Sequence, residues 1–373
     1  MRVTTVGITG YRSIRQLLAP VGPLTVLVGN NGVGKTNLYR SLELIQAAAS
    51  GTLADEIARE GGLASVHFAG ELKTHEKPRL ALEATIDGIL ESDDPMRYRI
   101  ELGFPTPVDA AFRLEAQVKS EALDLFQRKR TVELMERKGP SVWVRDDQGN
   151  RALASDELLA SEVALSSLRG SYREIDAVRH AITSWRFYHA FRTDADSPLR
   201  RPSRAITSPM LHPDGSNLAA VFATLRYVRQ ETVDLDAAID RAFPGAALIV
   251  PAPADTASFA MRFPDLPKRQ FGAHELSDGT LHYLALMGAL LAYRLPPFIA
   301  LNEPETSLHP DLLPALADLI VDASNRTQLW VVTHSRPLAD AIAQQSGVIS
   351  RDVIRQNGAT WLDGLTQFGE FKD

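Results

Sequence analysis

Apolar positions at the start of the chain follow two different periods. Residues 2–9 alternate weakly between apolar and polar, and residues 23–29 (PLTVLVG) form a short apolar run, which is typical of strands. Apolar residues then recur at helical spacing, at Leu38, Leu42, Ile45 and Ala49. A glycine-rich loop separates the run from the helix. The pattern therefore predicts a strand, a loop and a helix in that order.

The middle of the chain changes character twice. Residues 78–150 alternate in several short runs separated by turn-forming sequences, which predicts antiparallel strands. Residues 155–190 and 216–243 show helical spacing. Between them, residues 192–216 are rich in Arg, Pro, Ser and Asp, which predicts a loop or linker.

The last third alternates between apolar strands and helices. Strands are expected at 246–250, 258–263, 297–301 and 328–334, and helices near Ser277, over 310–323 and after residue 334, before terminal strands. This alternation predicts an α/β fold. We expect a discontinuous head formed by residues 1–105 and 245–373, with an inserted lobe of strands and then helices at 106–244.

Composition narrows the class of protein. Hydrophobic residues make up 45% of the chain and charged residues 23%, and cysteine is absent, which excludes disulfides and cysteine-ligated metal centres. The first residues contain no apolar core of signal-peptide length, and Arg294 interrupts the longest apolar stretch, so we expect a soluble cytoplasmic protein with no membrane span. The net charge of −6 means that any DNA contact must come from a local basic patch.

The loop at residues 29–36 (GNNGVGKT) matches the pattern G-x-x-x-x-G-K-[ST]. Glycines let the backbone wrap a phosphate chain, and successive N–H groups form an anion nest at a helix N-terminus. Lys35 would reach the β- and γ-phosphates, and Thr36 would offer its hydroxyl to Mg²⁺. The alternative is a purely structural turn. We expect ATP to be held by Asn30, Asn31, Gly32, Val33, Gly34, Lys35, Thr36 and Asn37.

A second motif ends an apolar strand with polar residues. The sequence FIALNEPE at residues 298–305 has the form of a Walker B segment, but Asn302 stands where Asp is usual. Asn302 can still accept a hydrogen bond from a metal-bound water, although it brings no charge. Glu303 is placed to orient and deprotonate the attacking water. The alternative for Glu303 is a surface carboxylate at a strand end.

Two further motifs flank this strand in the sequence. Residues 275–280 (ELSDGT) place Ser277 and Gly279 at a helix N-terminus, where N–H groups favour an anion. Taken alone, this is also an ordinary helix cap. His334 follows the apolar run QLWVV and could contact the γ-phosphate, although a lone histidine is more often structural.

These motifs, in this order, resemble those of the ABC-type ATPase superfamily. The stretch EPETSLHP at 303–310 narrows the resemblance to the RecF, SMC and OLD-type branch, and the whole chain resembles its small stand-alone ATPases of the AAA15/AAA21 type. The fragments GYRSIR, VGNNGVGKTNL and ELSDGT also carry the match, whereas the middle of the chain is matched much less. Arg12 matches a position where relatives contact nucleotide, with a salt bridge as the alternative. No glutamine lies between residues 51 and 75, where relatives carry one.

The resemblance implies an ATP sandwich. Two heads would dimerise head to tail around two ATP molecules, with Ser277 and Gly279 of one copy capping the γ-phosphate held by Lys35 of the other. Glu303 and His334 would then hydrolyse ATP and release the dimer. We expect slow hydrolysis, because Asn302 lacks the usual charge.

Three functions are compatible with such an ATPase to different degrees. The first is an ATP-gated DNA clamp in repair, recombination or phage defence, for which the candidate contacts are Arg128, Lys129, Arg130, Arg192, Arg200, Arg201 and Arg204. The second is a regulator of a separately encoded effector such as a nuclease. The third, a transporter subunit, is disfavoured by the long separation between Gly34 and Ser277.

Overall fold

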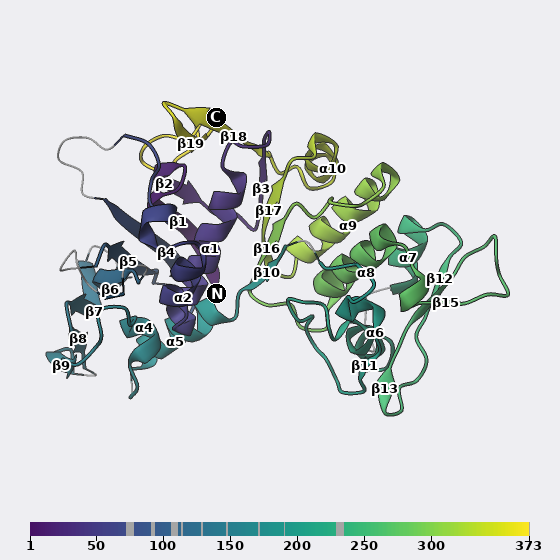
Figure 1. Ribbon diagram of the computed structural model, residues 1–373, viewed down its shortest axis with the longest axis horizontal. Coiled ribbons are helices and arrows are strands. Elements are labelled where there is room, and N and C mark those ends of the chain that lie inside the picture. Colours follow the sequence, from purple (N-terminus) through teal and green to yellow (C-terminus); the bar gives the residue numbers. More distant parts are fainter. Residues whose placement is uncertain are drawn as a thin grey trace. The chain divides into compact units, whose positions relative to one another are not determined.

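The computed structural model describes residues 1–71, 78–90, 94–105, 111–112, 115–127, 130–146, 148–170, 172–189, 191–228 and 235–372. It contains two compact units (Figure 1). Unit one comprises Met1–Gly22, Gly29–Trp185 and Arg351–Asp373, and unit two comprises Pro23–Val28 and Arg186–Ser350. These units follow internal packing and do not test the expected lobe at 106–244, whose boundaries stay a prediction.

Unit one contains an antiparallel sheet with the strand order β2-β1-β4-β5-β6-β7-β8-β9. Along β4, buried and half-buried side chains alternate strictly, as the period-two pattern predicts for a sheet with one face on the core. The strands are β1 (Arg2–Tyr11), β2 (Ile14–Pro20), β4 (Arg79–Asp87), β5 (Met96–Gly103), β6 (Gln117–Gln127), β7 (Arg130–Lys138), β8 (Ser141–Arg145) and β9 (Arg151–Ser155).

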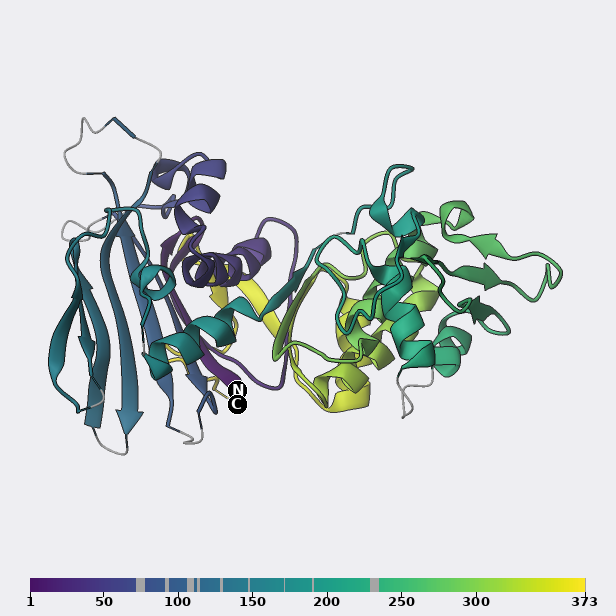
Figure 2. The same cartoon turned by 90° about the horizontal axis from the view of Figure 1, so that it is seen from below.

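Helix α1 (Lys35–Ser50) packs on β1 and β4 of this sheet and lies beside α5 (Arg173–Thr183) (Figure 2). It begins after Gly34 and ends at Gly51, and both glycines adopt the left-handed conformation that L-residues with a side chain avoid. Three short helices complete the unit: α2 (Leu53–Arg59), α3 (Leu63–Val66) and α4 (Ala164–Ser167).

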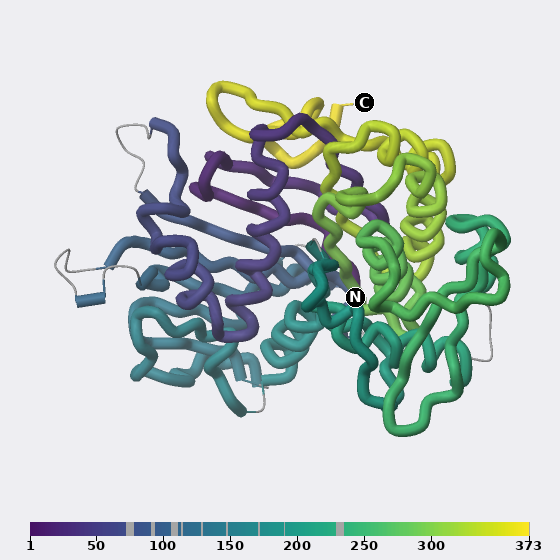
Figure 3. The backbone as a smooth tube through the Cα atoms, turned by 45° about the vertical axis from the view of Figure 1, so that its right-hand side comes forward, coloured from purple at the N-terminus to yellow at the C-terminus, as the bar shows by residue number. Residues whose placement is uncertain are grey.

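The last part of the chain returns to unit one. Strands β18 (Arg351–Gln356) and β19 (Ala359–Leu362) form an antiparallel hairpin, and β19 contacts β2. Figure 3 shows this yellow segment beside the purple N-terminal strands. The first and last segments of the described chain therefore pack together.

Unit two contains four parallel strands in the order β10-β16-β17-β3. Every residue of β16 (Phe298–Asn302) and β17 (Gln328–Thr333) is buried, which is expected for parallel strands covered on both faces. The flanking strands are β3 (Leu24–Val28) and β10 (Arg186–Tyr188). Because all four run the same way, their carboxyl ends lie at one edge.

Helices gather beside these strands (Figure 1). Helix α9 (Leu313–Ser324) contacts β17, α8 (Asp278–Leu291) and α10 (Arg336–Ser346), and an apolar core joins them. The remaining helical elements are α6 (Leu218–Tyr227), α7 (Leu235–Ala242), η1 (Pro198–Arg200), η2 (Ala273–Glu275) and η3 (Pro310–Leu312). Small sheets comprise β11 (Ser203–Arg204) with β13 (Thr256–Ala257), and β12 (Ala247–Ile249) with β14 (Ala260–Arg262) and β15 (Phe271–Gly272).

One segment expected to be helical contains a strand. Residues 155–190 include α4 and α5, but β10 at Arg186–Tyr188 pairs in parallel with β16. Three residues are too few to show a period, so the strand is specified by the neighbouring strand rather than by a local pattern.

Candidate functional site

The glycine-rich loop lies in unit one, between the end of β3 and the start of α1. Lys35 is buried, and its Nζ donates to the carbonyls of Gly29 and Asn30 at 2.7 and 2.8 Å. These bonds hold the ammonium inside the curve of the loop. An ammonium held beside a glycine-rich loop in this way can pair with phosphate oxygens.

Two side chains from outside the motif hold this loop in place. Thr360 of β19 donates to the Val33 carbonyl at 2.7 Å, and its Oγ1 lies 2.6 Å from the Ser13 hydroxyl. A Cβ on Gly34 would lie 2.0 Å from Thr360 Oγ1, so only glycine fits there. The motif gives no signal for Ser13 or Thr360, because both are distant in sequence.

Some of the other predicted loop residues are exposed, whereas Val33, Gly34 and Asn37 are half-buried. Asn30, Asn31 and Gly32 are exposed, and so is Thr36 in the first turn of α1. Asn37 donates to the Ser13 hydroxyl at 2.7 Å. The nucleotide-binding roles of these residues remain predictions.

Arg12 lies in the turn between β1 and β2 with a φ of 48°. Its guanidinium pairs with Glu60, with Nη2 2.6 Å and Nε 3.1 Å from Oε2. The salt bridge weighed as an alternative to a nucleotide contact is therefore present, and a contact with ATP would have to compete with it.

Asn302 and Glu303 of the Walker B segment and His334 lie in unit two, at the shared carboxyl edge of the parallel strands. Asn302 ends β16 and pairs in register with Val332 of β17, so Glu303 and His334 follow neighbouring strands. The His334 Nδ1 atom lies 3.8 Å from Glu303 Oε1. The structure thus brings together the two residues predicted to be catalytic.

Glu303 has a strained backbone. Its φ is 49°, in the left-handed region that residues with a side chain seldom occupy, and its N–H donates to Val332 at 2.7 Å. Such strain persists where surrounding structure imposes it, and it concentrates at functional sites. The Glu303 side chain remains about one-third exposed, at 32%, so it can reach a water molecule.

Glu305 is a site residue for which we predicted no role. Its Oε1 accepts from Thr333 Oγ1 at 2.6 Å and from the N–H groups of His334 and Ser335 at 2.9 and 3.0 Å. The same oxygen lies 3.0 Å from His334 Nδ1. The Glu305 carboxylate therefore fixes both the backbone and the ring of His334. Its place two residues after Glu303 in the motif was the only sequence signal.

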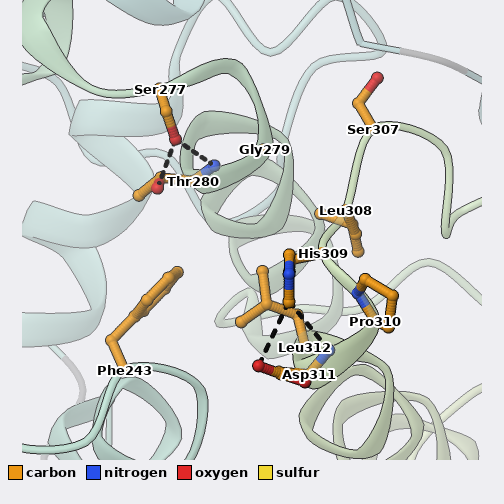
Figure 4. A pocket seen from close by; sticks show the side chains of 10 residues that line it. All are labelled: Phe243, Ser277, Gly279, Thr280, Ser307, Leu308, His309, Pro310, Asp311 and Leu312. Atoms are coloured by element: carbon orange, nitrogen blue, oxygen red, sulfur yellow. Dashed lines mark hydrogen bonds and ion pairs between the residues drawn. The ribbon is translucent and has the colours of Figure 1, made fainter.

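The signature residues Ser277 and Gly279 stand at the N-terminus of α8 (Figure 4). Ser277 caps the helix, and its Oγ accepts from Thr280 N at 3.3 Å. A Cβ on Gly279 would lie 2.7 Å from the Ser307 carbonyl, which explains the glycine. A pocket of about 630 Å³ opens here, between this helix end, Phe243 and residues 307–312.

A buried histidine links the signature helix to the Walker B turn. His282 of α8 donates from Nε2 to the Pro304 carbonyl at 3.1 Å, because a carbonyl oxygen can only accept. Burial lowers the pKa of His282, so the ring is held neutral. Any movement of α8 is therefore coupled to the backbone next to Glu303.

The arginines proposed for DNA binding have diverse partners. Arg200 donates to the Leu276 carbonyl at 2.8 Å and to Asp278 at 2.7 Å, which ties it to the signature loop. Arg192 forms a two-bond pair with Asp194. Arg204 is exposed and Arg130 begins β7, whereas Arg128 and Lys129 lie outside the described residues.

The donor set fits a magnesium ion bound mainly by ATP and water. Among the described residues, no group of three or more His, Asp or Glu side chains could hold a metal ion. Mg²⁺ bound with nucleotide commonly needs only one or two protein groups. In unit one, Thr36 offers an exposed hydroxyl next to the glycine loop, where Mg²⁺ would neutralise phosphate charge. In unit two, the buried Oδ1 of Asn302 has no hydrogen-bond partner among the described residues, so it can accept from a metal-bound water.

The glycine loop at the start of α1 and the polar edge of a parallel sheet define a P-loop ATPase of the mixed α/β class. Solved structures agree on this fold. The SMC head bound to the C-winged helix domain of ScpA matches with a TM-score of 0.57 at 15% identity, covering 97% of each chain. The chain belongs to the family described as "AAA domain, putative AbiEii toxin, Type IV TA system", whose profile matches residues 24–341.

Other SMC heads give similar matches. The head domain with a coiled coil and joint from Pyrococcus yayanosii matches with a TM-score of 0.53 at 10% identity, over 98% of each chain. The head domain from Pyrococcus furiosus, bound to the C-terminal domain of ScpA, matches with a TM-score of 0.52 at 14% identity, over 96% of this chain and 95% of that one. The predicted fold class and the resemblance to this branch are confirmed.

Two features expected of some protein classes were not found. No curated protein matches the chain in sequence. Within the described ranges, no helix has both the length and the apolar character needed to cross a bilayer.

Proposed function

We propose that this chain is an ATP-hydrolysing ATPase whose ATP-driven head-to-tail dimerisation gates DNA binding in repair, recombination or phage defence. The observation that carries the proposal is the pocket at the N-terminus of α8, where the Ser307 carbonyl allows only glycine at position 279. Helix N-terminal N–H groups and the Ser277 hydroxyl suit a phosphate, and a second copy would supply it as bound ATP.

Hydrolysis is assigned to the edge of the parallel strands. Glu303 would take the proton from the attacking water, and His334, held by Glu305, would face the γ-phosphate. Lys35 and the loop at 29–36 would bind the β- and γ-phosphates. Cleavage removes the shared γ-phosphate, so the two copies would separate.

The test is the oligomeric state with ATP. Glu303→Gln should lower turnover by roughly 100-fold or more, because a positioned general base contributes on that order. ATP–Mg²⁺ should then hold this variant as a dimer, measured by size-exclusion chromatography with light scattering. A monomer at every ATP concentration would contradict the sandwich.

Two further variants separate the parts of the proposal. Adding Lys35→Ala to Glu303→Gln should abolish both ATP binding and the dimer. Adding Ser277→Arg should leave ATP binding intact but prevent dimerisation, because the bulky side chain blocks the pocket. A dimer that survives Ser277→Arg would show that the copies associate through another surface.

A second candidate function is control of a separately encoded effector. The description of the family names a toxin of a type IV TA system, and two of the matching SMC heads are bound to domains of ScpA. Such an ATPase would change its affinity for a protein partner with its nucleotide state. Co-purification of Glu303→Gln with the products of adjacent genes, with and without ATP, would test this, and a lack of any ATP-dependent partner would count against it.

A further inference from the structure

The side-chain amide of Asn302 has a partner for its nitrogen, but its oxygen has none among the described residues. The residue is 2% exposed, and its Nδ2 lies 2.6 Å from Nδ1 of His189. Its Oδ1 is buried and has no hydrogen-bond partner among the described residues. A buried acceptor in this state costs free energy unless a ligand or water supplies a donor, so it marks a place where one is expected.

In the structure, the nitrogen of the Asn302 amide faces the His189 ring. An amide nitrogen can only donate, so His189 Nδ1 must accept, and the ring proton must lie on Nε2. With Nδ2 held by the ring, Oδ1 is turned away from His189. In the reverse orientation, the amide nitrogen would face a metal-bound water. Both groups are donors, so no hydrogen bond could form between them.

The topology explains why a residue so distant in sequence reaches this position. His189 directly follows β10, and Tyr188 pairs in register with Leu301 of β16. His189 comes directly after Tyr188, and Asn302 comes directly after Leu301. The two side chains therefore meet at the carboxyl edge. Carboxyl edges of parallel sheets are where such folds bind ligands.

We propose that His189 is a positioning residue that holds the Asn302 amide so that Oδ1 accepts from a magnesium-bound water. This inference rests on the proposed ATPase function. A neutral side chain at position 302 lacks the two equivalent oxygens of a carboxylate, so it needs a partner that sets its orientation. His189 is exposed, so its replacement should leave the fold intact.

The test compares two replacements of His189 in the full chain. His189→Ala removes the acceptor, whereas His189→Asn retains one, because an Asn oxygen can occupy the place of Nδ1. We measure how the affinity for a fluorescent ATP analogue depends on Mg²⁺ concentration, together with the rate of hydrolysis. His189→Ala should raise the Mg²⁺ concentration for half-maximal binding roughly five-fold, the effect of one ordinary hydrogen bond, and His189→Asn should restore it.

Coupling to Asn302 is tested by a double-mutant cycle. In the background of Asn302→Asp, His189→Ala should have a smaller effect, because a carboxylate presents an acceptor in either orientation. His180→Ala, at an exposed histidine of α5, is the matched control and should change nothing.

Each outcome decides a different question. Unchanged Mg²⁺ dependence in His189→Ala, or failure of His189→Asn to restore it, would overturn the positioning role while leaving the ATPase proposal intact. Equal effects of His189→Ala in both backgrounds would show that His189 does not act through Asn302. A parent protein that binds no ATP would overturn the proposed function together with this inference.

Discussion

At the scale of single residues, Glu305 organises the segment Thr333–Ser335. One oxygen of its carboxylate accepts hydrogen bonds from the Thr333 hydroxyl and two backbone N–H groups, and it also contacts the His334 ring. Charge-assisted hydrogen bonds of this kind are stronger than neutral ones and shape the loop that they join. The geometry of His334 therefore depends on a residue that need not touch ATP.

Glu305→Gln should separate hydrolysis from binding. Removing the charge should lower the rate of hydrolysis by roughly 10- to 100-fold, the effect of losing a charge-assisted hydrogen bond, because His334 would no longer be fixed. ATP affinity, measured by calorimetry, should change less than about two-fold, because Glu305 acts through His334 on the hydrolytic step and not on ground-state binding.

A control guards against a general loss of folding. The thermal unfolding midpoint of Glu305→Gln should stay close to that of the parent, because the glutamine oxygen can still accept from the Thr333 hydroxyl and the two backbone N–H groups. Equal losses of binding and hydrolysis would mean that Glu305 supports the whole unit rather than the position of His334.

At the scale of elements, α8 and the Walker B turn share the His282–Pro304 hydrogen bond. The pKa of His282 is lowered by burial, so between that lowered value and the ordinary value of about 6.5 the unfolded chain binds a proton that the folded chain does not. The contribution of His282 to the free energy of unfolding therefore falls as the pH decreases below about 6.5.

His282→Gln should remove this part of the pH dependence while keeping a donor for the Pro304 carbonyl. Urea unfolding at pH 7.5 and 5.5 should show a smaller loss of stability for the variant than for the parent. His180→Gln, at an exposed position, should behave like the parent. Identical losses in all three proteins would show that His282 does not contribute.

Local patterns predicted the elements that carry the motifs, but they did not predict how these elements are joined. The glycine loop, the apolar strands β16 and β17 and the alternating strand β4 each have a clear sequence period. Helix α8 begins where Ser277 predicts a cap.

Contacts between segments that are distant in sequence could not be predicted. His189 and Asn302 are 113 residues apart, and β10 is too short to reveal a period. Nothing in the motif at 29–36 indicates that Ser13 and Thr360 hold it. These partners are set by tertiary packing, which a single sequence does not display.

At the scale of the whole molecule, charge limits how DNA could be bound. The chain has a net charge of −6, and Arg200 is tied to the signature loop. Hydrogen bonds from Arg192 lower the pKa of Asp194 to about 2, although both side chains are exposed and such a pair is weak. Phosphates would have to displace such partners.

If the clamp proposal is right, duplex DNA should bind only with ATP present and should weaken steeply as salt rises. The double variant Arg192→Glu, Arg201→Glu should bind DNA more weakly. Its affinity should also depend less on salt, by about 0.9 in log–log slope for each phosphate that the protein no longer neutralises. Fluorescence anisotropy measures both.

Arg59→Glu serves as the matched control, because Arg59 is exposed and paired with an acidic neighbour, Glu56, in unit one. It should leave DNA binding unchanged. A complete absence of salt-sensitive binding in the parent would favour the effector-regulating function instead.

The hydrogen bond from Thr360 to Val33 also has a consequence for synthesis. It joins residues 327 positions apart, so the phosphate loop leaves the ribosome long before the residue that braces it exists. At translation rates of about 5–20 residues per second, the wait is roughly 15–65 s. A nascent chain should therefore acquire tight ATP binding only late, which would keep unfinished copies from being captured in dimers.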